Sequence, residues 1–397
     1  MSWLLNTAEK ATIDAFDQFI ESVVKANEGR NIYIWGASVR GTLLGILLEQ
    51  NGFSDFLYVD NDERKWGTNI NGHCIISAND FLKIRNNGYV IVPVEHYTEI
   101  REQLLSWSMI ENFDFYILKS ELYADFFHEF FRKYNGKYLV FGETFLRSVL
   151  LDEKPMRSMQ DDLYEAFGKE NMKILSIVCM GMEESYYYLK KQISLNMRPE
   201  NLLIFVNFET LTEKHHMLPR VQHPVLTEMI QSGSEGVSPD LSEYIKKAKE
   251  RALDYRLELQ YSPRRTYSGE PDDVEIQKEY TRQQLLNQIS SDYEECQYLV
   301  KILQTCMENK IEAAVIVVPV NYQKASDFFG ERYKIIHKKN IETLSRMILD
   351  LNCEFIDMSE LLEKDLFETR VTLMDGIRYE GRKRITQKLK TYFGLQE

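Results

Sequence analysis

At 397 residues the chain is long enough for two or three domains with separate hydrophobic cores, and its 44% apolar content is typical of globular proteins. The formal net charge of −13 at pH 7 repels nucleic-acid phosphate and anionic lipid, so we expect neither as a partner. No apolar run approaches the ~18 residues of a membrane span, and the first residues lack the pattern of a signal peptide. The five cysteines form no CxxC pair, so we predict a cytoplasmic protein.

Apolar runs and helical patterns alternate at the start of the chain, which predicts an α/β domain over residues 1–120. The expected elements are, in chain order, a helix at 8–28, a strand at 31–35, a helix at 43–50, a strand at 56–59, a strand at 89–94, a helix at 97–107 and a strand at 113–118.

A glycine-rich turn follows the first of these strands. Gly36, Ser38 and Gly41 occupy the positions of a G-x-G-x-x-G dinucleotide-binding turn, with serine in place of the second glycine. The Ser38 side chain crowds a pyrophosphate, although its hydroxyl could bond one. Asp60 ends the second strand, about 20 residues on, where such domains bind a ribose hydroxyl. These residues predict a nucleotide site, and the alternative is a domain kept for packing or protein contact.

Two stretches of this domain, IWGASVRG and LYVDNDERKWGTNINGHCIIS, carry a resemblance that covers roughly residues 30–118. They resemble the small Rossmann-like domains of bacterial sugar-modifying and polysaccharide-synthesis proteins. The resemblance implies that a bound cofactor or ligand would be a nucleotide or nucleotide-sugar.

A second α/β domain is expected over residues 137–397, after a linker helix at 121–136 with a phenylalanine stripe. Its strands are continuous apolar runs separated by helices, which predicts a parallel sheet of flavodoxin type buried on both faces. A polar, acidic stretch at about 231–295 predicts an inserted helical cap. The predicted strands lie at residues 138–141, 174–180, 202–206, 313–320 and 354–356.

Ligands of parallel sheets bind beyond the carboxyl ends of the strands. The residues that follow these strands are therefore the candidates for a site. They are Gly142, Glu143, Thr144, Gly181, Asn207, Asn321 and Asp357, and the C-terminal turn adds Asp375 and Arg378.

This set resembles the conserved blocks of the SGNH hydrolase family over about residues 137–393. Gly142-Glu143-Thr144 stands where the family has Gly-Asp-Ser, Gly181 matches the second-block glycine, and Asn207 matches the third-block asparagine. Asp375 to Arg378 matches the final Asp-x-x-His. The spacing is similar to the subgroup near the D-alanyl transfer proteins of teichoic acid synthesis and polysaccharide O-acetylation, which implies a role in bacterial cell-surface glycan synthesis or modification.

Two departures from the family leave two functions open. Threonine replaces the nucleophilic serine, and Arg378 replaces the histidine base, yet arginine stays protonated and cannot accept the proton of a hydroxyl. The first hypothesis is a catalytically degenerate protein that binds a glycan, a nucleotide-sugar or a partner enzyme of glycan synthesis. Arg378 would then clamp a carboxylate or phosphate of the ligand, or pair with Asp375 or Glu143.

The alternative is an acyltransferase or esterase acting on a glycan or its precursor. Thr144 would be the nucleophile, backbone N–H groups of Thr144 and Gly181 with Asn207 would stabilise the oxyanion, and Asp375 would orient groups or act as a weak base. Histidines at 215, 216 and 223 are the nearest substitutes for a base, but we expect solvated side chains there. No spacing supports a metal site.

Overall fold

The structure is a computed structural model that describes residues 7–27, 29–94, 97–118, 129–130, 132–150, 152–176, 180–212, 285–349, 351, 353–368 and 376–395, with a few single residues between 243 and 282. The chain divides into two compact units, Met1–Asp125 and Phe126–Glu397. Both are α/β units with parallel strands, as the sequence predicted. The cap expected at 231–295 and the linker helix expected at 121–136 lie for the most part outside the described residues.

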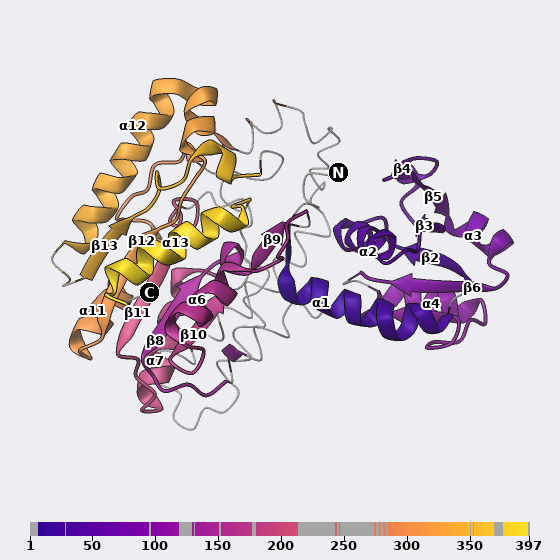
Figure 1. Cartoon of the computed structure of the whole chain (residues 1–397), viewed down its shortest axis with the longest axis horizontal. Helices are drawn as coiled ribbons and strands as arrows, with labels where there is room; N and C mark the ends of the chain where they lie inside the picture. Colours follow the sequence, from indigo (N-terminus) through magenta and orange to yellow (C-terminus); the bar gives the residue numbers. More distant parts are fainter. Residues whose placement is uncertain are drawn as a thin grey trace. The chain divides into compact units, whose positions relative to one another are not determined.

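Unit 1 has a six-stranded sheet of order β4-β5-β3-β2-β6-β7, parallel except for the β4–β5 pair. Taken without the edge hairpin strand β4, its strands follow the chain order 3-2-1-4-5 of a Rossmann sheet. Figure 1 shows β2 and β6 side by side in this sheet. The elements are β1 (Thr7–Glu9), α1 (Lys10–Phe19), β2 (Asn31–Trp35), α2 (Val39–Gln50), β3 (Phe56–Asp60), β4 (Asn69–Ile70), β5 (His73–Ser77), α3 (Ala78–Ile84), β6 (Gly88–Val92), α4 (Thr98–Ser106) and β7 (Phe115–Ile117).

Unit 2 has a five-stranded, fully parallel sheet of order β10-β8-β11-β12-β13. This is the chain order 2-1-3-4-5 of flavodoxin-like sheets. Each strand matches an apolar run predicted from the sequence. The elements are β8 (Tyr138–Gly142), β9 (Ser148–Leu150), α6 (Met159–Phe167), β10 (Met172–Ser176), α7 (Met182–Ser194), β11 (Asn201–Val206), α11 (Glu294–Glu308), β12 (Glu312–Val317), α12 (Tyr322–Ile348), β13 (Cys353–Asp357) and α13 (Tyr379–Tyr392).

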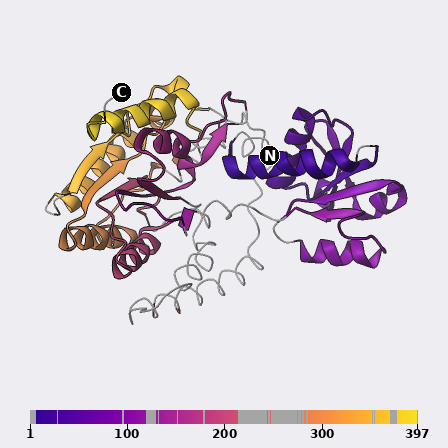
Figure 2. The same cartoon turned by 60° about the horizontal axis from the view of Figure 1, so that its bottom comes forward.

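Helices cover both faces of the second sheet, which explains why its strands are apolar throughout. One face packs against α6 and α13, whose Leu163 and Ile385 are completely buried in a core with Val140 and Ile316. The other face meets α7 and α11, and the Phe141 ring packs edge-on against Tyr188 of α7. In Figure 2 the yellow α13 and the brown-orange α11 lie on opposite sides of the strands.

One edge of this sheet is the strand β10, and residues 129–130 and 132–135 contact it. Arg132 donates to the backbone oxygen of Met172, and the Asn135 N–H donates to Glu170 O at 3.0 Å. The Lys173 amine is buried and donates to Phe130 O at 3.0 Å. Burial lowers the pKa of Lys173 to about 8. The backbone of the edge strand is therefore covered by the segment that precedes β8.

A buried polar chain fastens α12 to the end of β13. The Ser359 hydroxyl donates to Asp357 Oδ1 at 2.6 Å, and His337 Nε2 lies 3.0 Å from the same hydroxyl. The Tyr333 hydroxyl lies 3.4 Å from His337 Nδ1. Burial lowers the pKa of His337 below its ordinary value, while Asp357 acts in the opposite sense. The imidazole is therefore held neutral, with Glu360 Oε1 3.9 Å from Nε2.

We expect unit 2 to lose stability as the pH falls below 6.5, the ordinary pKa of histidine, because the unfolded chain then binds a proton that the folded His337 excludes. Burial raises the pKa of Glu360, whose titration opposes this effect at lower pH. His337→Gln should flatten the dependence between about pH 7.5 and 5.5. Urea unfolding followed by far-UV circular dichroism measures it.

Unit 1 provides an internal control in the same samples. All 4 tryptophans precede residue 126, so tryptophan fluorescence reports the unfolding of unit 1 alone. That transition should be identical in wild type and variant. An unchanged pH dependence of the unit 2 transition in His337→Gln would contradict a role for this histidine.

Candidate functional site

The candidate site lies where the chain order of the second sheet reverses. From β8 the chain first moves to β10 on one side and later to β11 on the other, so the carboxyl ends of β8 and β11 flank the switch point. Glu143 follows β8 and Asn207 follows β11, and Asn207 Nδ2 donates to Glu143 Oε2 at 3.0 Å. Asn207 Oδ1 accepts from the Thr210 N–H at 2.8 Å, which fixes the orientation of the amide.

Hydrogen bonds join the ends of β8 and β10 next to this site. The Ser176 hydroxyl at the end of β10 donates to the main-chain oxygen of Glu143. Arg147, which is 4% exposed, donates from NH1 to the Ser176 carbonyl at 2.9 Å. These bonds tie the ends of β8 and β10 together beneath the Glu143 side chain.

Thr144, the expected nucleophile, begins a short 3-10 turn, Thr144–Leu146, next to Glu143. Its carbonyl accepts from the Arg147 N–H at 2.8 Å, and the residue is half-buried. Within the described residues its hydroxyl has no hydrogen-bond partner. The structure thus brings Glu143, Thr144 and Asn207 together at the switch point.

Gly181 lies at the start of α7, and its N–H, an expected oxyanion donor, is already used. It donates to Glu184 Oε2 at 3.0 Å, and the next N–H, that of Met182, donates to Glu295 Oε2 at 2.6 Å. Both carboxylates are buried, Glu295 reaching across from α11. Carboxylates are favourable at a helix N-terminus because they meet its positive end. This helix end is therefore neutralised from within the protein.

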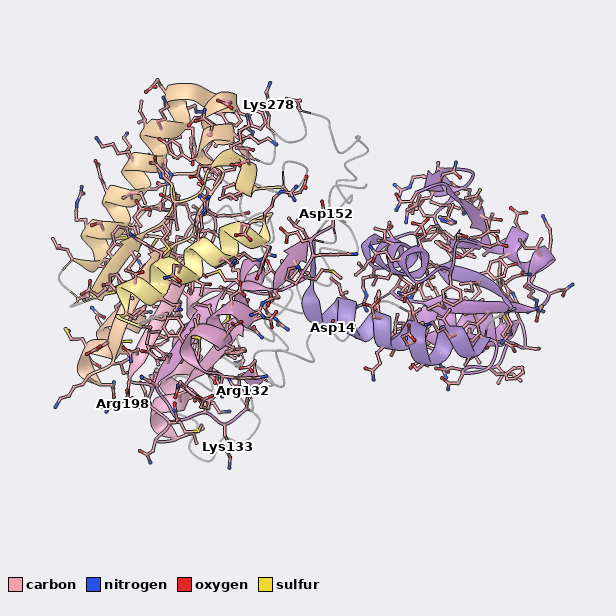
Figure 3. The ribbon with its side chains drawn as sticks, viewed as in Figure 1. Asp14, Arg132, Lys133, Asp152, Arg198 and Lys278 are labelled. Carbon is pink, nitrogen blue, oxygen red and sulfur yellow. The ribbon has the colours of Figure 1, made fainter. Side chains whose placement is uncertain are left out.

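Arg378 is the residue before α13. Arg378 NH2 donates to Glu368 Oε2 at 2.7 Å, and NH1 lies 3.9 Å from Asp152, labelled in Figure 3. The backbone bond from Arg378 N to Leu366 O at 2.8 Å holds it beside the 364–368 segment, and its expected pairing with Asp375 or Glu143 stays a prediction. Asp375 and the three histidines at 215, 216 and 223 lie outside the described residues, so their roles stay predictions.

The glycine turn of unit 1 has the geometry that its sequence implied. Gly36 has φ of +115°, and a side chain there would meet Val94 Cγ1 at 2.3 Å. A Cβ on Gly41 would lie 1.9 Å from the Gly36 carbonyl oxygen, so helix and turn pack too closely for any other residue. Ser38 caps α2 by accepting from the Gly41 N–H at 3.3 Å.

Asp60 holds this turn to β3. Its Oδ2 accepts from the Ala37 N–H at 2.8 Å and from Lys65 Nζ at 2.9 Å, and its Oδ1 accepts from the Asp62 N–H at 2.9 Å. Lys65 Nζ also donates to Ala37 O at 3.0 Å. Both carboxylate oxygens thus have internal partners, and the contact between Asp60 and a ribose stays a prediction.

Sequence reasoning missed the partners that complete these clusters. Glu295 and Glu368 are far in sequence from the groups that they bind, and nothing in their local pattern marked them. Lys65 stood inside the quoted DERKWG stretch, whose lysine was a usable signal.

Within the described ranges, no cluster of three or more His, Cys, Asp or Glu could hold a metal, and no helix is long and apolar enough to cross a membrane.

Comparisons with known proteins bear on the two units differently. Residues 28–113 match the family model described as C2185-like, N-terminal, a stretch that runs from before β2 to just before β7. The search of curated proteins gave no match.

Similar solved structures cover a larger part of the chain. Catalytic mutants of Axe2, an acetylxylan esterase from Geobacillus stearothermophilus, superpose with a TM-score of 0.32 at 9% identity, covering 67% of this chain and 97% of theirs. LAE5, an α/β hydrolase enzyme from the metagenome of Lake Arreo, Spain, gives a TM-score of 0.32 at 7% identity, covering 67% and 99%. At these values the function must be argued from the site itself.

We expect Asp60→Ala to destabilise unit 1 by about 3 kcal/mol, because it leaves the Lys65 amine and the Ala37 N–H without their shared acceptor. Urea unfolding read by tryptophan fluorescence measures this. Asp62→Asn is the matched control, since Asp62 pairs with the exposed Arg64 at the surface. It should cost less than about 1 kcal/mol. Equal effects of the two variants would contradict the clamp role of Asp60.

Proposed function

We propose that unit 2 is an SGNH-like domain that binds a ligand at the switch point without hydrolysing esters. In this proposal the ligand is a glycan, a nucleotide-sugar or a partner enzyme of bacterial cell-surface glycan synthesis, as the sequence resemblance implies. The proposed site comprises Glu143, Thr144 and Asn207, to which the sequence resemblance adds Arg378.

One observation carries this proposal: the Asn207 amide, matched to the oxyanion donor of the family, donates to the Glu143 carboxylate at 3.0 Å. A hydrolase needs that donor to face the oxygen on which negative charge develops. Here that donor is already engaged by the Glu143 carboxylate, so an oxyanion would have to compete with this hydrogen bond.

The other catalytic groups support the same conclusion. The Gly181 N–H, the second expected oxyanion donor, faces Glu184. The nucleophile of such an enzyme also needs a base, and Arg378, which stands in the histidine position, is a permanent cation engaged with Glu368. Among the described residues, the switch point therefore has polar groups suited to bind a ligand, while its two expected oxyanion donors already have internal acceptors.

We expect wild type to hydrolyse p-nitrophenyl acetate no faster than Thr144→Ala does. Glu143→Gln keeps an acceptor for Asn207 but removes the charge, and it should remain inactive because no base is gained. Release of p-nitrophenolate followed by absorbance measures all three proteins. Turnover by wild type that disappears in Thr144→Ala would overturn the proposal in favour of the acyltransferase or esterase alternative.

We also propose a nucleotide or nucleotide-sugar as the ligand of unit 1. The first turn of α2 and the Lys65 amine at 3.0 Å from Ala37 O provide N–H donors and a cation beside the glycine turn. Calorimetry with UDP-glucose and with NAD should give heat for at least one of them, and Lys65→Gln should weaken that binding. Absence of heat with both would leave this turn a packing element only.

A further inference from the structure

The start of α12 carries a buried amide with an unused donor. Asn321 follows β12 and caps the helix, its Oδ1 accepting from the Lys324 N–H at 3.1 Å. Asn321 is 1% exposed, and its Nδ2 has no hydrogen-bond partner. The amide cannot be turned around to remedy this, because its nitrogen would then face another N–H. The buried NH₂ group is therefore fixed at the N-terminus of the helix, where an unsatisfied donor is costly.

The helix that Asn321 caps provides the electrostatics of this place. Asn321 stands at the N-terminus of α12, where the partial positive charge of the helix favours an anion. The next residues of the helix include Lys324, whose side chain is buried.

The location ties this place to the switch point. β12 is the neighbour of β11, with Val317 in register with Val206, and the Val318 N–H donates to Val206 O at 3.0 Å. Neighbouring strands are ~4.8 Å apart, so Asn207 and Asn321 leave the same edge of the sheet from adjacent strands.

We propose that the N-terminus of α12, with Asn321 Nδ2 as the specific donor, binds a carboxylate or phosphate group of the ligand held at the switch point. This inference rests on the proposed function, because it assigns a chemical class to the same ligand: an acidic or phosphorylated sugar. The positive end of α12 provides the favourable charge around that group, and the amide provides its orientation.

The test uses the full chain and three probes at matched ionic strength: inorganic phosphate, D-galacturonate and the neutral D-galactose. Calorimetry should give binding of phosphate, of galacturonate or of both, which separates a phosphorylated ligand from a carboxylated one, and galactose should bind more weakly than the anion that binds. Asn321→Asp keeps the cap oxygen on the Lys324 N–H but replaces the free donor by a carboxylate oxygen. It should weaken anion binding about tenfold or more.

Gln323→Glu is the matched control. It makes the same amide-to-carboxylate change two residues along the same helix turn, at an exposed position whose Nε2 donates to Asp327 at 2.8 Å. It should change anion binding less than about threefold, since only the screened charge differs. The thermal midpoint of Asn321→Asp should equal or exceed that of wild type, because aspartate is as good a cap as asparagine.

Two results would overturn the inference: no binding of either anion by wild type, or equal weakening in the two variants. The outcome of the ester assay is independent of both results. Inactivity toward p-nitrophenyl acetate without anion binding would reject only the anionic class of ligand. Ester turnover through Thr144 together with anion binding that depends on Asn321 would reject only the non-hydrolytic function.

Discussion

The second unit depends on one contact, the hydrogen bond from the Asn207 amide to the Glu143 carboxylate across the switch point of its sheet. The parallel order of the strands places the two residues side by side, and the bond from Thr210 N–H to Asn207 Oδ1 fixes which end of the amide carries the NH₂ group. The Glu143 carboxylate at the end of β8 therefore engages the donor side of this amide. An apolar side chain in place of Glu143 would leave the amide without this acceptor.

A common pattern appears at three helix or turn starts of the chain. Carboxylates from elsewhere in the fold engage N–H groups at the turn before α2, at α7 and at α13, through Asp60, Glu295 and Glu153. Each of these carboxylates neutralises a place where backbone donors converge. The start of α12 differs from these three, because its cap is an amide whose oxygen bonds the helix while its nitrogen is left over.

The sequence predicted the strands well and the side-chain partners poorly, for physical reasons. Strands such as β2 and β8 are continuous apolar runs buried on both faces, so the pattern alone places them. The order of the strands places Glu143 beside Asn207. The sequence predicted both residues as candidates because each follows a strand. Partners such as Glu368 on Arg378 depend on how distant loops fold back, and no local periodicity encodes that. The sequence also did not predict that Asp60 binds its own glycine turn, because an acid at the end of a strand can face either a ligand or that turn.

The contacts that residues 129–130 and 132–135 make with β10 affect how unit 2 can be separated from the rest of the chain. A strand at the border of a sheet can recruit the strand of another molecule, and Arg132, on Met172 O, blocks this by occupying an outward-facing carbonyl. A fragment trimmed to begin at β8 would keep every strand and helix of the sheet. It would nevertheless lose the contact of Arg132 with the edge strand and leave the buried Lys173 amine without its acceptor at Phe130. The exposed edge of β10 could then pair with a strand of another copy. The segment before β8 thus belongs to the second unit, because it protects the edge of the sheet from pairing with other molecules.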